Sequence, residues 1–193
     1  MTVFILSCSY SDKDFYLNET ERVFLNTFKA GDTLYYESST KQVDKILVLG
    51  IDSNQKKESG YIMALPAYND VFVSIKHLPV DTFQSISQDM TTKKIDTIPE
   101  KIICISKHPQ QKETVYSFQF KHFFSSNKNG IGQIQRDTVI NGKKLTNYFI
   151  IKEDFQDKNT SYAKIEQLYW TQNEGLVAYK LTNGIYWTKK SSR

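Results

Sequence analysis

One segment of the chain alternates apolar and polar side chains with a period of two, and this pattern constrains the fold more than any other. In an extended chain, successive side chains point to opposite faces. Between Thr114 and Phe124, one face would carry Tyr116, Phe118, Phe120, His122 and Phe124, and the other Ser117, Gln119 and Lys121. The alternation therefore predicts a half-buried β-strand, ended by the turn residues 127–130.

Strand signals dominate the rest of the chain as well. Twelve Tyr and twelve Phe favour pleated, half-buried surfaces. Further strands are predicted at residues 33–38, 44–52, 61–65, 71–78, 101–106, 133–140, 143–152, 162–171, 176–181 and 185–188. One short helix is expected over 19–28, and a long connection over 79–100. About ten mostly antiparallel strands predict an all-β domain, either a sandwich or an open or closed barrel.

Two Asn-Gly pairs mark hairpins. Asn141-Gly142 and Asn183-Gly184 suit a two-residue type I′ turn, because both central residues of that turn need positive φ. The second pair closes a predicted meander of three strands at the end of the chain. The 193 residues are expected to form one domain over residues 21–193.

The charge distribution argues against a nucleic-acid partner. The net charge is +4, and the longest basic runs are pairs of lysines scattered along the chain. A nucleic-acid-binding domain usually gathers its basic residues on one face. No stretch approaches the roughly 18 apolar residues that a membrane-spanning helix needs.

The N-terminus changes abruptly from apolar to polar at Cys8. Ile5-Leu6-Ser7-Cys8 resembles the lipobox of bacterial lipoproteins, and a polar stretch follows it. The resemblance implies that the thiol of Cys8 carries a diacylglycerol and that cleavage makes Cys8 the first residue. A further acyl chain such as palmitate then secures the anchor, because a single chain holds only weakly. The apolar run Val3–Leu6 is short, so residues 1–8 would be the end of a longer signal; the alternative is a short cytosolic strand.

Three further segments resemble small lipoproteins of the Bacteroidetes type, a group of largely uncharacterised function. They are 28–35, a first strand entry; 141–149, a middle hairpin; and 169–187, a closing hairpin. Together with Cys8, the resemblance implies a lipid anchor in the outer membrane or on the periplasmic face of the envelope. Residues 9–20 would form the tether.

No segment carries a catalytic or cofactor motif, so we expect no cofactor. His77, His122 and Cys104 could converge on zinc, or Cys104 and His122 could form a nucleophile pair, but ordinary packing is the simpler interpretation. A hydrolase would need a histidine near strand carboxylates, for which Asp137, Glu153, Glu166 and Glu174 are candidates.

The expected function is therefore a lipid-anchored, non-enzymatic protein that binds an apolar ligand or an envelope protein. Two alternatives stay open: an envelope hydrolase that uses His77 or His122 with strand carboxylates, and a purely structural lipoprotein. The aromatic face of Tyr116, Phe118, Phe120 and Phe124 could line a ligand cavity together with Tyr35, Phe149 and Trp170, or it could be core.

The alternation yields a stability prediction. Phe118→Ala should lower the free energy of unfolding by about 3–5 kcal/mol, as for a packed core aromatic. Gln119→Ala, on the opposite face, should change it by less than about 0.5 kcal/mol. If the face lines a ligand cavity, the Phe118 variant would lose less stability and lose ligand instead. Denaturant titrations measure both, and equal losses at the two positions would contradict the predicted strand faces.

Overall fold

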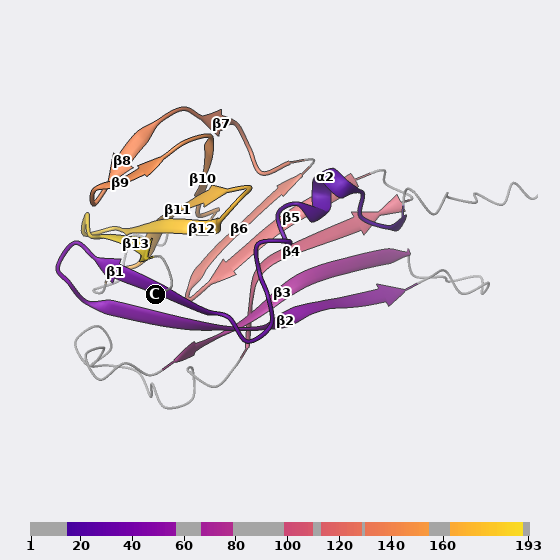
Figure 1. Ribbon diagram of the computed structural model, residues 1–193. Helices are drawn as coiled ribbons and strands as arrows, with labels where there is room; N and C mark the ends of the chain where they lie inside the picture. Colours follow the sequence, from indigo (N-terminus) through magenta and orange to yellow (C-terminus); the bar gives the residue numbers. More distant parts are fainter. Residues whose placement is uncertain are drawn as a thin grey trace, which may run out of the picture.

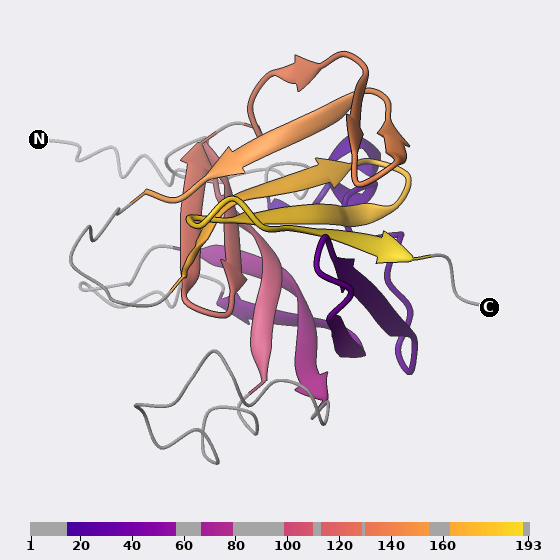
Figure 2. The same cartoon turned by 90° about the vertical axis from the view of Figure 1, so that its left-hand side faces the viewer.

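The protein is described by a computed structural model over residues 15–56, 67–78, 99–109, 113–128, 130–154 and 163–190. Its main feature is a curled, half-barrel sheet of 11 strands in the order β6-β5-β4-β3-β2-β1-β13-β12-β11-β10-β7 (Figures 1 and 2). The elements are α2 (Glu19–Arg22), β1 (Thr33–Ser38), β2 (Val43–Lys56), β3 (Tyr68–Leu78), β4 (Glu100–His108), β5 (Glu113–Phe120), β6 (Phe123–Lys128), β7 (Ile134–Gln135), β8 (Thr138–Ile140), β9 (Lys143–Leu145), β10 (Tyr148–Lys152), β11 (Ile165–Thr171), β12 (Gly175–Leu181) and β13 (Tyr186–Lys190). The predicted all-β, mainly antiparallel, single-domain class is confirmed.

Two meanders and the short strand β7, which pairs with β10, make up the large sheet. The first runs from β1 to β6 and the second from β10 to β13, and each strand pairs with its neighbour in the sequence. They are joined by β1 and β13, which pair antiparallel with Tyr36 opposite Lys189 and Ser38 opposite Trp187. We call this junction the seam. The hairpin of β8 and β9 forms a separate two-stranded sheet over the outer face of the second meander.

The strand predicted over 114–124 is wrong at its end. β5 stops at Phe120, and Lys121 and His122 form a two-residue turn, with Lys121 at φ 55°. A turn reverses the chain, so Phe123 is buried opposite Phe120 while Phe124 is 45% exposed. Tyr116, Phe118 and Phe120 share the buried face as predicted, but Phe124 and His122 do not belong to it.

The two Asn-Gly turns differ. Asn141 and Gly142 both have positive φ (47° and 77°) and connect the paired residues Ile140 and Lys143, as predicted. At the second hairpin only Gly184 has positive φ. There the Leu181 N–H donates to the carbonyl of Ile185 (2.9 Å), which makes a three-residue turn of 182–184. Asn183 instead accepts the Ile185 N–H through its side chain (3.1 Å), a local bond that favours this turn.

Other predicted elements are shorter or longer than expected. The two long strands of the middle hairpin break into β7, β8, β9 and β10, with Asn147 at φ 49° between β9 and β10. The helix is only Glu19–Arg22, closed at its start by a capping box of Asn18 and Glu21. The strand expected at 61–65 and most of the connection 79–100 lie outside the described residues.

The segment after α2 packs into the concave side of the sheet. Phe24 lies 5.8 Å from the rings of both Tyr116 and Phe149, and Phe28 lies 5.7 Å from Trp170. Phe118 contacts the same Trp170 at 5.4 Å. The aromatic face of β5 is thus packed against core side chains. Tyr35, by contrast, is 38% exposed on β1 and is not part of this face.

The two border strands of the large sheet, β6 and β7, differ in how their free edges are covered. At β6, Asp154 accepts the Ser126 N–H (2.8 Å) and the Ser125 hydroxyl (3.2 Å), and its own N–H donates to Phe124 O (3.1 Å). The border strand is therefore covered by a carboxylate. At the other border stands β7, which is only two residues long.

Gly175 lies where the packed segment touches the sheet, and it yields a prediction. It has φ +70°, and a Cβ there would lie 2.8 Å from Phe28 Cζ and 2.9 Å from Thr27 Oγ1. Gly184 has a similar φ, +83°, with nothing within 4 Å of the added carbon. Gly184→Ala should cost about 1–2 kcal/mol from backbone strain alone. Gly175→Ala should cost about 1–3 kcal/mol more, from overpacking. Urea titrations compare the two, and equal losses would contradict the close approach of Phe28.

Candidate functional site

The candidate residues from the sequence do not converge as one site. Cys8 lies outside the described residues. Cys104 is half-buried, opposite Ser117, and its sulfur lies 3.7 Å from the Ser106 hydroxyl. His122 is in the exposed turn beyond the end of β5, so Cys104 and His122 do not form a nucleophile pair. Among the described residues no group of three His, Cys, Asp or Glu could hold a metal ion.

His77, however, meets two carboxylates that are distant in the sequence. Its Nδ1 lies 3.4 Å from Asp44 Oδ1 and its Nε2 lies 3.6 Å from Glu100 Oε2. Asp44 also accepts a hydrogen bond from the Tyr179 hydroxyl (2.8 Å) and pairs with Lys121 Nζ (2.9 Å). The Lys121 N–H donates to Glu100 (2.7 Å). We call these five residues the buried charge cluster.

The electrostatics of the cluster favour its charged form. Burial alone would raise the pKa of Asp44, but Lys121 and His77 outweigh it and hold that pKa well below its usual range. Burial alone would lower the pKa of His77, but the contacts with Asp44 and Glu100 raise it. Tyr179 is buried beside Asp44, and both effects raise its pKa. Two carboxylates, an ammonium and an imidazolium thus compensate one another in a largely buried place.

The geometry of the cluster suits bracing rather than metal binding or hydrolysis. Asp44 and Glu100 lie at opposite nitrogens of the imidazole, so their oxygens and His77 do not face a common point. The side chain of Asp44 is only 4% exposed; its Oδ2 already receives Tyr179 and Lys121, and its Oδ1 faces His77. The cluster links residues of the first meander to Tyr179 of the second. It therefore connects the two meanders through the interior.

The other carboxylates considered for hydrolysis do not join this cluster. Three of them pair with surface lysines: Asp137 with Lys144, Glu166 with Lys180, and Glu174 with Lys143. Glu153 has a raised pKa because it is partly removed from water. The carboxylates that lie close to a histidine, as the hydrolase alternative requires, are thus Asp44 and Glu100. The sequence pattern did not indicate either of them as a candidate.

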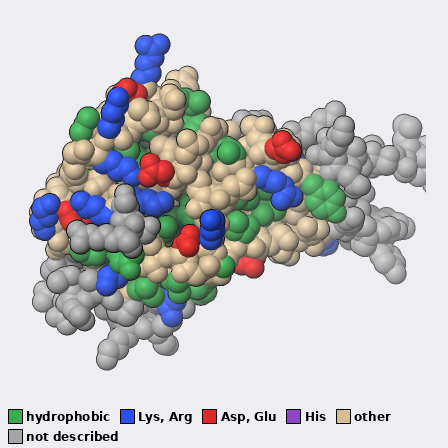
Figure 3. Space-filling view, viewed as in Figure 1, with side chains coloured by type: hydrophobic (Ala, Val, Ile, Leu, Met, Phe, Trp, Pro, Cys, Tyr) green, Lys and Arg blue, Asp and Glu red, His purple; other side chains and the backbone are tan. Residues whose placement is uncertain are grey.

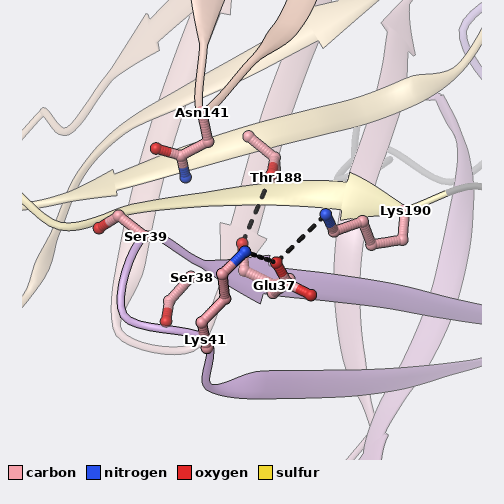
Figure 4. Close-up of a pocket in the computed structure, with 7 residues that line it drawn as sticks. All are labelled: Glu37, Ser38, Ser39, Lys41, Asn141, Thr188 and Lys190. Carbon is pink, nitrogen blue, oxygen red and sulfur yellow. Dashed lines mark hydrogen bonds and ion pairs between the residues drawn. The ribbon is translucent and has the colours of Figure 1, made fainter.

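Two hollows on the outer surface meet at the tip of the β8–β9 hairpin. The first, the polar hollow, has a volume of about 210 Å³ and is lined by Glu37, Ser38, Ser39, Lys41, Asn141, Thr188 and Lys190 (Figure 4). Lys41 and Lys190 both reach Glu37 Oε1, at 3.0 and 3.2 Å. Their hydrogen bonds lower the pKa of Glu37. Two ammonium groups around one carboxylate leave an excess of one positive charge.

The second, the tyrosine hollow, has a volume of about 340 Å³. It is lined by Thr138, Val139, Ile140, Asn141, Tyr148, Ile150, Tyr169 and Tyr186. Three tyrosines stand in a row across the sheet, with ring centroids 6.0 Å apart for Tyr148 and Tyr169 and 6.2 Å for Tyr169 and Tyr186. Burial raises the pKa of Tyr169, whose hydroxyl donates to Gln167 (2.9 Å). Aromatic rings with polar tips are suited to binding surfaces.

The elements that line the two hollows are joined by hydrogen bonds to one backbone carbonyl, that of Tyr186. Tyr186 O accepts from Asn141 Nδ2 (3.0 Å) and from the Ser39 N–H (2.8 Å). The tip of the hairpin and the β1–β2 turn are thereby fixed to β13 side by side. Figure 4 shows Asn141 reaching down from the hairpin over Thr188 and the Glu37 pairs. The two hollows share Asn141, one being polar and the other aromatic, and we call them together the groove.

The groove lies at the end of the molecule away from α2. In Figure 1, α2 is on the right, while the β1–β2 turn, β13 and the hairpin are on the left. Figure 3 shows that most of the lysine and arginine side chains visible from this side gather over that left-hand end. The sequence predicted Asn141 as a turn residue, but not as part of a binding surface. In the polar hollow, the lining residues of β1 and β13 are brought together by the seam, whereas the tyrosine hollow is built from the small hairpin and the second meander.

Comparison with protein-family models, with curated proteins and with solved structures found no match. In the described part of the chain, no helix is long and apolar enough to cross a membrane.

The raised pKa of His77 predicts a pH-dependent stability. A raised folded-state pKa means that the native protein holds the proton more tightly than the unfolded chain does. This contribution is complete below the unfolded value of about 6.5 and is lost as pH rises through the folded value. The wild type should therefore lose stability as pH rises above about 6.5 and through the raised pKa of His77.

His77→Gln should remove most of that loss. His122→Gln, which removes a histidine from the exposed turn, is the matched control and should keep it. Urea titrations at several pH values measure the effect. An unchanged pH dependence in His77→Gln would contradict the role given to the cluster.

Proposed function

We propose that the chain is a lipid-anchored domain of the bacterial cell envelope that binds another envelope protein and catalyses no reaction. The anchor is the diacylglycerol on Cys8 that the lipobox-like Ile5-Leu6-Ser7-Cys8 implies. The binding surface is the groove. The observation that carries the proposal is the position of the groove, at the opposite end of the domain from the point where the N-terminal segment joins it.

Chain length supports this orientation. Phe15 is fully buried, and its carbonyl accepts a hydrogen bond from Asn69 Nδ2 (3.1 Å). Phe15 therefore already belongs to the packed domain. The seven residue steps from Cys8 to Phe15 span at most about 25 Å. A lipid on Cys8 would keep the α2 end near the membrane, and the groove would face away from it.

The chemistry of the groove favours a protein over a purely apolar ligand. Its tyrosine floor resembles the centre of protein interfaces, where Tyr is enriched, and the lysines and serines of the polar hollow resemble a polar rim. Val139, which stands at its wall, is 66% exposed, and Ile134 on neighbouring β7 is 57% exposed. The aromatic interior, which an apolar ligand would need, is occupied by Phe24 and Phe28.

The burial and mutual pairing of the charge cluster support the proposal that the chain catalyses no reaction. A general base needs a free lone pair near a substrate. Asp44 Oδ2 is already engaged by Tyr179 and Lys121, Asp44 Oδ1 faces His77 Nδ1, and His77 Nε2 faces Glu100. These contacts stabilise the fold.

Anchoring is tested by a substitution at Cys8. Expressed behind a lipoprotein signal in a Gram-negative host, the wild type should enter the membrane fraction, and Cys8→Ser should move to the soluble fraction. Cys104→Ser is the control, because it removes the other cysteine and should leave the protein in the membrane fraction. Retention of Cys8→Ser in the membrane would overturn the anchor.

Partner binding is tested in the same cells with a photo-crosslinker. With p-benzoylphenylalanine in place of Tyr186, which lines the tyrosine hollow, irradiation should yield one crosslinked protein of defined mass. The same group in place of Gln119, exposed on β5 in the other meander, should yield none. If neither position gives a crosslink, the purely structural alternative holds.

A further inference from the structure

One backbone edge in the groove has no strand beside it. β8 pairs with β9 and with no other strand of the described chain. A two-residue type I′ turn closes on a hydrogen-bonded pair, here Ile140 and Lys143. In an antiparallel ladder the next pair, Val139 and Lys144, is then not hydrogen-bonded, so both residues direct N–H and C=O outward. Val139 thus presents one donor and one acceptor on the free side of β8.

The tyrosine hollow runs along this free edge. All three residues of β8 line it, and Tyr148, Tyr169 and Tyr186 form its floor. An added strand would direct alternate side chains onto the floor and the others toward solvent, because strand side chains alternate. The exposed side chain of Val139 would contact the added strand as well.

Charge sets a further requirement at one end of the hollow. Beyond Asn141 the groove opens into the polar hollow, where Lys41 and Lys190 surround Glu37. The excess positive charge favours an acidic side chain there. An apolar lipid would satisfy neither these lysines nor the free N–H and C=O of Val139.

We propose that the groove takes an extended segment of the partner protein, which adds a third strand to β8 and places an acidic side chain in the polar hollow. Main-chain hydrogen bonds to Val139 give this mode its affinity, and the tyrosine floor with the lysines gives it selectivity. This inference rests on the proposed function and names the kind of partner segment that the groove recognises.

The first experiment removes the free N–H with proline, which is tolerated at strand edges. Val139→Pro should abolish the crosslink from the Tyr186 position in cells. Lys144→Pro is the matched control, because it removes the outward N–H of the paired residue on the far edge of the same hairpin; it should keep the crosslink. A crosslink that survives Val139→Pro would overturn strand addition while leaving the proposed function in place. A crosslink missing from the wild type would overturn the proposed function.

The second experiment is independent of whether Val139→Pro folds. The probes are acetylated, amidated peptides of alternating valine and threonine with two glutamates at one end or the other. In ¹H–¹⁵N spectra of the wild-type domain, at least one should shift the amides of residues 138–141. Two further versions of the peptide carry N-methyl groups on the odd-numbered or on the even-numbered residues. Only one of these sets of N–H groups faces β8, so one version should bind at least about tenfold more weakly and the other should not.

Charge reversal completes the test. Lys190→Glu should weaken binding of the acidic peptide several-fold without changing that of a glutamine version. Lys128→Glu on β6, which alters a comparable exposed pair with Glu113 of β5, should leave the binding of both peptides unchanged. Absence of shifts at 138–141 with every peptide, or equal binding by methylated peptides, would overturn strand addition.

Discussion

The pairing of β1 with β13 is the constraint on which the rest of the molecule depends. It joins residues 35–38 to residues 187–190 and thereby turns two local meanders into one sheet. Tyr36 reinforces it from inside, with its hydroxyl donating to Leu176 O (2.9 Å) and its ring 5.6 Å from that of Tyr179. Each meander can form from contacts between neighbours in the sequence. The seam closes a loop of nearly the whole chain, and such non-local contacts form slowly.

The polar hollow of the groove and the buried charge cluster both depend on that seam. On the outside, the polar hollow is built from β1 and its turn on one side and from β13 on the other. On the inside, the hydrogen bond from Tyr179 to Asp44 crosses between the same two meanders, and Lys121 lies 5.6 Å from the Tyr179 ring and 5.9 Å from the Trp187 ring. A change that loosens the interior would therefore also alter the walls of the groove.

Local patterns in the sequence predicted local structure well. The alternation at 116–120 fixed which side of β5 is buried, and Asn141-Gly142 fixed the register of the small hairpin. The turn at Lys121 was missed because a lysine at positive φ carries none of the Gly or Asn signal of such turns. His77 was recognised as a titratable residue on an apolar face, but its partners Asp44, Glu100 and Lys121 come from three other strand ends. The polar hollow was not predictable for the same reason, since its lining depends on the seam, and the tyrosine hollow depends on how the small hairpin folds over the second meander.

The carboxylate of Asp154 at β6 bears on how such domains behave beside one another. Lipid anchors would confine many copies to a surface, where their sheet borders meet far more often than in free solution. A neighbouring copy that tried to add a strand at β6 would have to displace Asp154 from Ser125 and Ser126 and bury its negative charge. Asp154 therefore disfavours strand addition at residues 124–126 of that border, which would matter most for a domain crowded on a surface by the proposed anchor.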